Sequence, residues 1–411
     1  MRAGTARHRL RRSMSAAPVF RTPCHTPEMA MAPWRRVIGS AVGAVDRAVV
    51  VAMQMHGARD RARADKMPHA ERLEVLAAIH RDYGGDAIVA DAATFFATPP
   101  AIDPVLRAVR QETEARSVPV GVWDAQWPSN FEPYLPEVAA KYLSRIENRT
   151  ARARLFLGEE RGARGASSAS SASSLTKRPA VIAIHGYMGG HWMLEEAQWP
   201  LAWLARRGLD VALPVLPFHA LRSGPSRGAP PFPSADPRLT NEGFRQAVAD
   251  IVSLARWLRA RGAPHVGVMG MSLGGYTTSL LATVTRDIDF VMPMIPLASI
   301  ADFAREQGRL GIGEQADAQH AALERANWVV SPLARPLALP ASRAIVVAAE
   351  HDRITPSAHA RRIATHFGCE LVTIPGGHLV QLGRSEAFRG LASMLERDKI
   401  IAPRPQRPHR S

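Results

Sequence analysis

A serine lies at the centre of the G-x-S-x-G pentapeptide 270–274, between an apolar run and a helix-like stretch. A serine hydroxyl is a weak nucleophile, so attack on a carbonyl requires that it be projected on a sharp turn between a strand and a helix. Gly270 and Gly274 permit the close approach of backbone that such a turn needs. We therefore predict that Ser272 is a nucleophile and that the Leu273 backbone N–H, at the start of the helix, donates to an oxyanion.

An aspartate and a histidine follow the serine in the chain order that acyl transfer can use. Asp352 comes just after the apolar, strand-like run 344–349, and His378 follows the strand-like run 370–374. An imidazole can take the serine proton and return it to a leaving group, while a carboxylate fixes the tautomer of the imidazole. Because the carboxyl ends of parallel strands meet at one edge of a sheet, we expect Ser272, Asp352 and His378 to meet there.

These assignments have alternatives. Glu350 and Asp302 also follow strand-like segments and are the competing acids. Helix capping does not account for Asp352, because Thr355 before a proline is expected to cap the next helix. His378 is selected from fifteen histidines by its position after both the nucleophile and the acid.

A glycine-rich segment, 185–190, follows another strand-like run. A loop of this kind can supply a second oxyanion N–H, for which we predict Tyr187, with Met188 as the alternative. In their order, the glycine-rich loop, the serine pentapeptide, the acid loop and the final histidine resemble the α/β-hydrolase superfamily over about residues 140–400. Residues 216–222, Leu-Pro-Phe-His-Ala-Leu-Arg, resemble more weakly the esterase and dienelactone-hydrolase-like branch.

The resemblance implies an α/β-hydrolase fold, with a mainly parallel twisted sheet and helices on both faces, and the alternation of strand-like and helix-like segments favours the same class. It also implies a serine hydrolase that cleaves a small carboxylic ester through an acyl-enzyme. Thioester or amide cleavage and acyl transfer are alternatives, because specificity resides in the pocket walls. A catalytically silent scaffold that binds a ligand or a partner is the alternative from another class.

The chain of 411 residues is expected to divide into four parts. Residues 1–35 are a basic, disordered or mis-annotated start, 36–140 a helical extension, 141–397 the catalytic domain with 297–335 as a short lid or an ordinary connection, and 398–411 a basic disordered tail. Smaller expected features are helices over 70–115, an irregular segment with Trp123 and Trp127 over 118–133, a hairpin over 145–156 and a mobile loop over 165–174.

Residues 37–55 are apolar enough to suggest a membrane span, but Asp46 and Arg47 stand at the centre. Charges are costly at that depth in hydrocarbon. We therefore predict a helix packed on the protein and no transmembrane span.

The net charge of +15 is concentrated at the two ends. Residues 1–36 hold eight arginines and one glutamate, and residues 397–411 hold four arginines, one lysine and one aspartate. A nucleic-acid groove needs its charge on the folded body, so we predict no specific nucleic-acid site.

The remaining motifs favour a cofactor-free enzyme. Cys24 and Cys369 lie in unrelated contexts, so no disulfide framework is predicted. A loose dinucleotide fingerprint at 311–316 follows a helix-like stretch, whereas a binding fingerprint follows a strand. We predict no cofactor, no metal and a cytoplasmic location, and leave the oligomeric state open.

Overall fold

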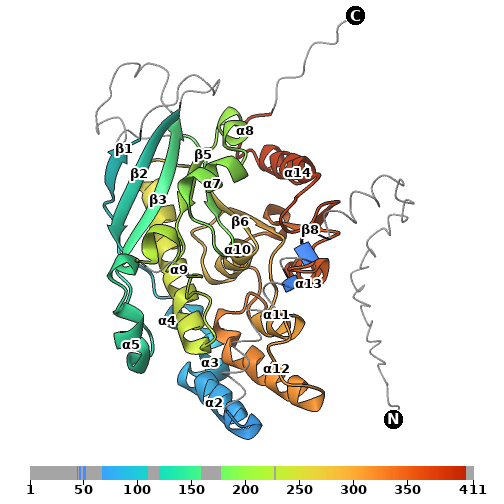
Figure 1. Ribbon diagram of the computed structural model, residues 1–411. Coiled ribbons are helices and arrows are strands. Elements are labelled where there is room, and N and C mark those ends of the chain that lie inside the picture. Colours follow the sequence, from blue (N-terminus) through green and yellow to red (C-terminus); the bar gives the residue numbers. More distant parts are fainter. Residues whose placement is uncertain are drawn as a thin grey trace, which may run out of the picture.

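The computed structural model describes residues 44, 46–47, 50–51, 67–109, 120–158, 177–225 and 228–403. At its centre lies a mixed nine-stranded sheet in the order β1-β2-β3-β5-β4-β6-β7-β8-β9 (Figure 1). The strands from β5 to β9 in this order run parallel, and β1, β2 and β3 pair antiparallel at one edge. The strands are β1 (Val105–Ala108), β2 (Val120–Pro128), β3 (Thr150–Gly158), β4 (Ala180–Ile184), β5 (Asp210–Pro214), β6 (Val266–Met271), β7 (Phe290–Met294), β8 (Ile345–Ala349) and β9 (Glu370–Ile374).

Helices cover both faces of this sheet, so the predicted α/β fold class is confirmed (Figure 1). The helices are α2 (His69–Asp82), α3 (Gly85–Ala90), α4 (Ala92–Phe95), α5 (Pro136–Leu143), α7 (Trp192–Gln198), α8 (Leu201–Arg206), α9 (Pro237–Ala260), α10 (Leu273–Val284), α11 (Ile300–Glu306), α12 (Glu314–Ala326), α13 (Ser357–Phe367) and α14 (Arg384–Arg397), with short 3₁₀ turns η1 (Ile146–Arg149), η2 (Ala220–Arg222), η3 (Trp328–Val330) and η4 (Ala341–Arg343).

Alternate residues of the central strands face two hydrophobic cores. In β4, Ile182 and Ile184 lie in one core with residues of α9, α10 and α13, whereas Val181 and Ala183 lie in the other with residues of α8 and α14. Successive side chains of a strand point to opposite faces, so a strand covered on both faces must be apolar throughout. This explains why the strand-like runs in the second half of the sequence are continuous and not alternating.

The N-terminal half contains strands where the sequence analysis predicted none. β2 pairs with β3 over residues expected to be irregular, and Trp123 and Trp127 are buried in its core-facing positions. β1 likewise occupies part of the expected helical stretch 70–115. The interpretation of 36–140 as a helical extension is therefore corrected: α2, α3 and α4 belong to it, but the sheet begins at Val105. The strand was missed because the prolines and glycines at its ends are typical of a loop, although Trp123, Ala125 and Trp127 alternate with less buried residues as in a half-buried strand.

Two other boundaries also differ from prediction. The expected hairpin over 145–156 is wrong, because residues 146–149 form the 3₁₀ turn η1 and β3 pairs with β2 and β5. Ile400 and Ile401 do not fit the expected disordered tail 398–411, because both are buried in the core beside α14. Residues 1–35, 165–174 and 404–411, and most of 37–55, lie outside the described residues.

The insert 297–335 forms α11 and α12, and α12 packs on α2. His80 Nδ1 lies 3.0 Å from the Arg325 carbonyl oxygen, and Gln319 Nε2 lies 3.0 Å from His69 Nδ1. The N-terminal helices and the insert thus form one helical layer at the lower end of the molecule in Figure 1. A lid role for the insert stays a prediction.

Gly274→Ala is expected to lower the free energy of unfolding by about 3 kcal/mol or more, because overpacking against backbone cannot be relieved by a rotamer change. A Cβ at Gly274 would stand 2.6 Å from the His185 carbonyl oxygen and would overlap the Ile184 carbonyl oxygen. Urea denaturation measures the effect. Gly390→Ala in α14 is the matched control, since its Cβ would meet side chains only at 3.7 Å or more. That variant should gain about 0.5–1 kcal/mol, and equal stabilities of the two variants would contradict the packing argument.

Candidate active site

Ser272 lies in a left-handed backbone conformation at the junction of β6 and α10, with φ 55° and ψ −112°. A non-glycine residue in this region is strained and is held only by its surroundings. Its N–H donates to the Met294 carbonyl oxygen of β7 at 3.0 Å, which ties the turn to the neighbouring strand. This is the sharp strand-to-helix turn that the sequence predicted.

The glycine-rich loop after β4 packs against this turn. A Cβ on Gly186 would lie 3.5 Å from the Ser272 Cβ, so the loop and the serine are neighbours. Leu273 is the first residue of α10. Backbone N–H groups in the first turn of a helix have no acceptor within the helix and can donate to another group. Tyr187 and Met188 follow Gly186, and Met188 has a left-handed φ of 64° that turns the loop. The positions of Leu273 and Tyr187 are therefore compatible with the predicted oxyanion donors.

Asp352 and His378 are brought together by the adjacent loops after β8 and β9. The Asp352 Oδ2 to His378 Nδ1 distance is 2.8 Å, and the carboxylate is buried. A carboxylate in this place fixes the imidazole with its proton on Nδ1 and leaves Nε2 as the basic nitrogen. The register of β8 with β9, in which Ala349 pairs with Ile374, sets the two loops side by side.

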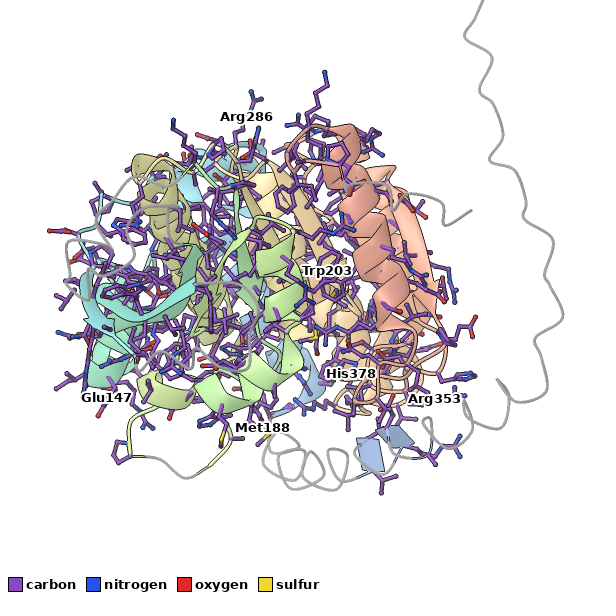
Figure 2. All side chains as sticks on the ribbon, turned by 90° about the horizontal axis from the view of Figure 1, so that it is seen from above. Glu147, Met188, Trp203, Arg286, Arg353 and His378 are labelled. Carbon is purple, nitrogen blue, oxygen red and sulfur yellow. The ribbon has the colours of Figure 1, made fainter. Side chains whose placement is uncertain are left out.

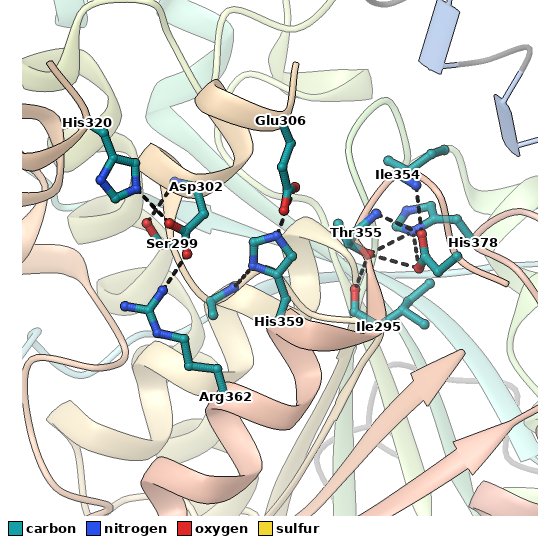
Figure 3. Close-up of polar contacts among 12 residues, drawn as sticks. Ile295, Ser299, Asp302, Glu306, His320, Ile354, Thr355, His359, Arg362 and His378 are labelled. Atoms are coloured by element: carbon teal, nitrogen blue, oxygen red, sulfur yellow. Dashed lines mark hydrogen bonds and ion pairs between the residues drawn. The ribbon is translucent and has the colours of Figure 1, made fainter. Parts of the chain in front are cut away.

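Thr355 joins the same group, although sequence reasoning predicted it as a helix cap. Its Oγ1 lies 2.9 Å from Asp352 Oδ2 and 3.0 Å from both His378 Nδ1 and the Ile295 carbonyl oxygen (Figure 3). The cap prediction is wrong because Pro356 is the N-cap of α13 and no side chain caps that helix. Asp352 Oδ1 in turn accepts from the Ile354 and Thr355 N–H groups at 2.9 and 2.7 Å.

Gln381 connects the histidine loop to the serine turn. Its Nε2 donates to the His378 carbonyl oxygen at 3.3 Å and to Met271 Sδ at 3.4 Å, and Met271 immediately precedes Ser272. Within the described residues the Ser272 hydroxyl makes no hydrogen bond. Catalytic hydrogen bonds are often long without substrate and tighten in the complex.

The competing acids lie elsewhere. Asp302, in α11, pairs with His320 at 2.6 Å and with Arg362. Glu350 is exposed. Neither carboxylate is bonded to His378, whereas Asp352 is.

Two other histidines, His185 and His219, lie in or near the glycine-rich loop and are buried, with ring nitrogens hydrogen-bonded to backbone groups. His185 Nδ1 donates to the Gly186 carbonyl oxygen at 2.7 Å, and its Nε2 accepts from the Leu216 N–H at 3.0 Å. Burial lowers the pKa of His185, and it lowers the pKa of His219 to about 3. Both rings are therefore neutral at pH 7, and His185 connects the glycine-rich loop to the segment after β5.

No group of three or more histidine, cysteine, aspartate or glutamate residues in the described ranges could hold a metal ion. Among the helices described, none has the length and apolar content required to cross a bilayer.

Thr355→Val is expected to lower kcat about tenfold, the typical effect of losing one hydrogen bond to a charged group. Valine keeps the shape of the threonine but removes the hydroxyl beside Asp352. Steady-state hydrolysis of a p-nitrophenyl ester, the substrate class that the sequence predicts, measures the change. Thr283→Val is the control, because Thr283 is also buried and donates to the Leu280 carbonyl oxygen at 2.8 Å, far along α10. Wild-type kinetics in Thr355→Val would show that the hydroxyl has no positioning effect.

The sequence and the fold were compared with those of known proteins. No family model matches the chain. Two uncharacterised proteins of Mycobacterium tuberculosis, from strains CDC 1551 / Oshkosh and H37Rv, are each 28% identical over 335 residues, or 79% of this chain and 75% of each relative. The acetyl xylan esterase from Paenibacillus sp. R4 is 14% identical, with a TM-score of 0.50 over 75% of this chain and 93% of that chain. Acetyl xylan esterase 1 from Thermoanaerobacterium sp. JW/SL YS485 is 15% identical, with a TM-score of 0.49 over 75% and 93%. The first of these two structures shows a shared fold.

Proposed function

The chain has the α/β-hydrolase fold, and on this premise we propose that it is a serine hydrolase that cleaves carboxylic esters. The observation that carries the proposal is the 2.8 Å bond between Asp352 and His378, placed at the sheet edge where Ser272 stands on a strained turn. The esterase activity named for the similar structure from Paenibacillus sp. R4 is consistent with it. Fold alone does not imply function, so the proposal rests on the site.

In the proposed reaction, the Ser272 Oγ attacks the ester carbonyl carbon while His378 Nε2 takes the hydroxyl proton. The Leu273 and Tyr187 backbone N–H groups donate to the oxygen that becomes negative. The carbon–oxygen bond to the alcohol then breaks, and the imidazolium returns the proton to the leaving alkoxide. Water, activated by the same imidazole, hydrolyses the acyl-enzyme and restores the Ser272 hydroxyl. Asp352 stabilises the imidazolium throughout.

Thioesters and amides would use the same residues, with a thiol or an amine as the leaving group. Their discrimination depends on the pocket walls. An ester is the proposed class because the sequence resemblance implies one, and the similar structure with a TM-score of 0.50 is named an acetyl xylan esterase.

Labelling of the wild-type protein with a fluorophosphonate probe, beside hydrolysis of p-nitrophenyl acetate, butyrate and decanoate, tests the proposal. We expect stoichiometric labelling at one serine and measurable turnover of at least one ester, whose chain length then indicates the acyl preference. A folded protein that neither labels nor hydrolyses any of them would favour the catalytically silent scaffold.

A further inference from the structure

A carboxylate from far upstream in the chain is buried against the loop that carries His378. Asp46 has 0% exposure, and its Oδ2 accepts from the His378 N–H at 2.6 Å while its Oδ1 accepts from the Leu379 N–H at 3.1 Å. The described residues around Asp46 are helical, and Figure 2 shows this short blue segment beside the labelled Arg353 and His378.

The same carboxylate also reaches the loop that carries the acid. Asp46 Oδ2 lies 3.4 Å from the backbone nitrogen of Arg353, the residue after Asp352. One side chain is thus bonded to the backbone of both loops that supply the acid and the base. These two loops come from different strands, and their relative position sets the Asp352 to His378 distance.

Burial of a carboxylate is costly unless hydrogen bonds compensate it. No described basic side chain forms an ion pair with Asp46, and the neighbouring Arg47 is exposed. Backbone N–H groups that donate to a carboxylate form strong, charge-assisted bonds. The three N–H groups therefore compensate the cost of burying Asp46. In turn, Asp46 is the acceptor for the N–H groups of His378 and Leu379.

The histidine loop has few bonds of its own at this point. Within it, the Gly377 N–H donates to the Val380 carbonyl oxygen at 2.9 Å, and Gln381 contacts the His378 carbonyl oxygen. Neither bond uses the N–H of His378 or Leu379. Loss of Asp46 would leave the N–H groups of His378 and Leu379 without an acceptor among the described residues. The backbone that carries the imidazole would then be less constrained.

We propose that Asp46 is a positioning residue for the histidine base, so that a side chain far upstream in the chain completes the active site. This inference rests on the proposed hydrolase function. It also assigns a role to the acidic residue of the Asp46–Arg47 pair in the apolar run 37–55. Displacement of a catalytic group by about 1 Å can cost about 10²-fold in rate, so a loop anchor can have a large effect on kcat without contacting substrate.

The test compares the full-length variants Asp46→Ala and Asp46→Asn with wild type, and Arg47→Ala is the matched control from the same helical turn. Two experiments are done: steady-state kinetics give kcat and KM for a p-nitrophenyl ester, and mass spectrometry gives amide hydrogen exchange in peptides that cover 375–383. We expect Asp46→Ala to lower kcat by about 10- to 100-fold, with KM within about twofold, and to accelerate exchange at 378 and 379. Asp46→Asn should be intermediate, because its amide oxygen can still accept one bond. Arg47→Ala should match wild type.

Unchanged kcat and unchanged exchange in Asp46→Ala would overturn the inference. Faster exchange in peptides from β4 and β6 in both Asp46→Ala and Asp46→Asn would also overturn the inference. It would show that Asp46 stabilises the whole fold and does not act specifically on the histidine loop. If wild type hydrolyses no ester, the proposed function fails, but the exchange data still decide whether Asp46 anchors the loop. If wild type is active and both Asp46 variants equal it, only the present inference fails.

Discussion

Ser272→Ala is expected to abolish fluorophosphonate labelling and to lower ester turnover by about 10⁴-fold or more. In the proposed reaction the serine supplies the atom that forms the acyl-enzyme, and loss of a triad nucleophile typically leaves only the residual effect of binding and the oxyanion donors. Gel-based labelling and p-nitrophenyl ester hydrolysis, measured on the same preparations, give both results. The thermal melting curve should be nearly unchanged, because alanine removes one hydroxyl that makes no hydrogen bond within the described residues.

The matched control is Ser279→Ala, two turns along the same helix. Ser279 is buried, and its hydroxyl donates to the Gly275 carbonyl oxygen at 2.9 Å. This variant should retain labelling and activity, with a stability loss of about 1 kcal/mol. Labelling that persists in Ser272→Ala would place the reactive serine elsewhere and would refute the proposed nucleophile.

The strands that carry the candidate site residues could be predicted from the sequence because the signals for them are local. A continuous apolar run of five residues that ends in a glycine-rich or acidic loop describes a buried parallel strand and its carboxyl end. This pattern located β4, β6 and β8, whereas β9 contains Glu370 and Thr373 and was predicted from a more mixed strand-like run. Since these strands lie in one parallel sheet, the residues that follow them had to lie at the same edge, which is how Asp352 was expected beside His378.

Other features depended on contacts that a local pattern does not contain. The hydroxyl of Thr355 is directed by the turn after β8, so a capping rule based on the next proline misplaced it. β2 pairs with a strand some 30 residues later in the chain, as Asp124 opposite Arg154 shows, and a local pattern does not identify that partner. Asp46 is the extreme case, because its hydrogen-bond partners lie more than 300 residues away.

One signal for Asp46 was nevertheless present in the sequence. A single acidic residue in a long apolar run is expensive to bury, and this cost already argued against a membrane span. The same cost implies a specific set of donors wherever such a residue packs on protein. What the sequence could not specify was which donors these are, because backbone N–H groups have no residue identity.

Asp352→Asn is expected to lower kcat/KM by about 10³- to 10⁴-fold with little change in fold. The asparagine amide would present N–H to His378 Nδ1, so the imidazole would carry its proton on Nε2 and could not accept the proton of Ser272. It would also lack the charge that stabilises the imidazolium during each half of the reaction. Ester hydrolysis and the rate of fluorophosphonate labelling should fall together, since both need the same base.

Asp302→Asn is the control with the most discriminating power, because Asp302 is the competing acid and also pairs with a histidine, His320, at 2.6 Å. That pair joins α11 to α12 and does not contact His378, so kcat/KM should stay within about threefold of wild type. The reverse result, with Asp302→Asn inactive and Asp352→Asn active, would transfer the acid role to α11. Near-wild-type activity in both variants would mean that His378 acts without a carboxylate partner, which the buried 2.8 Å bond to Asp352 argues against.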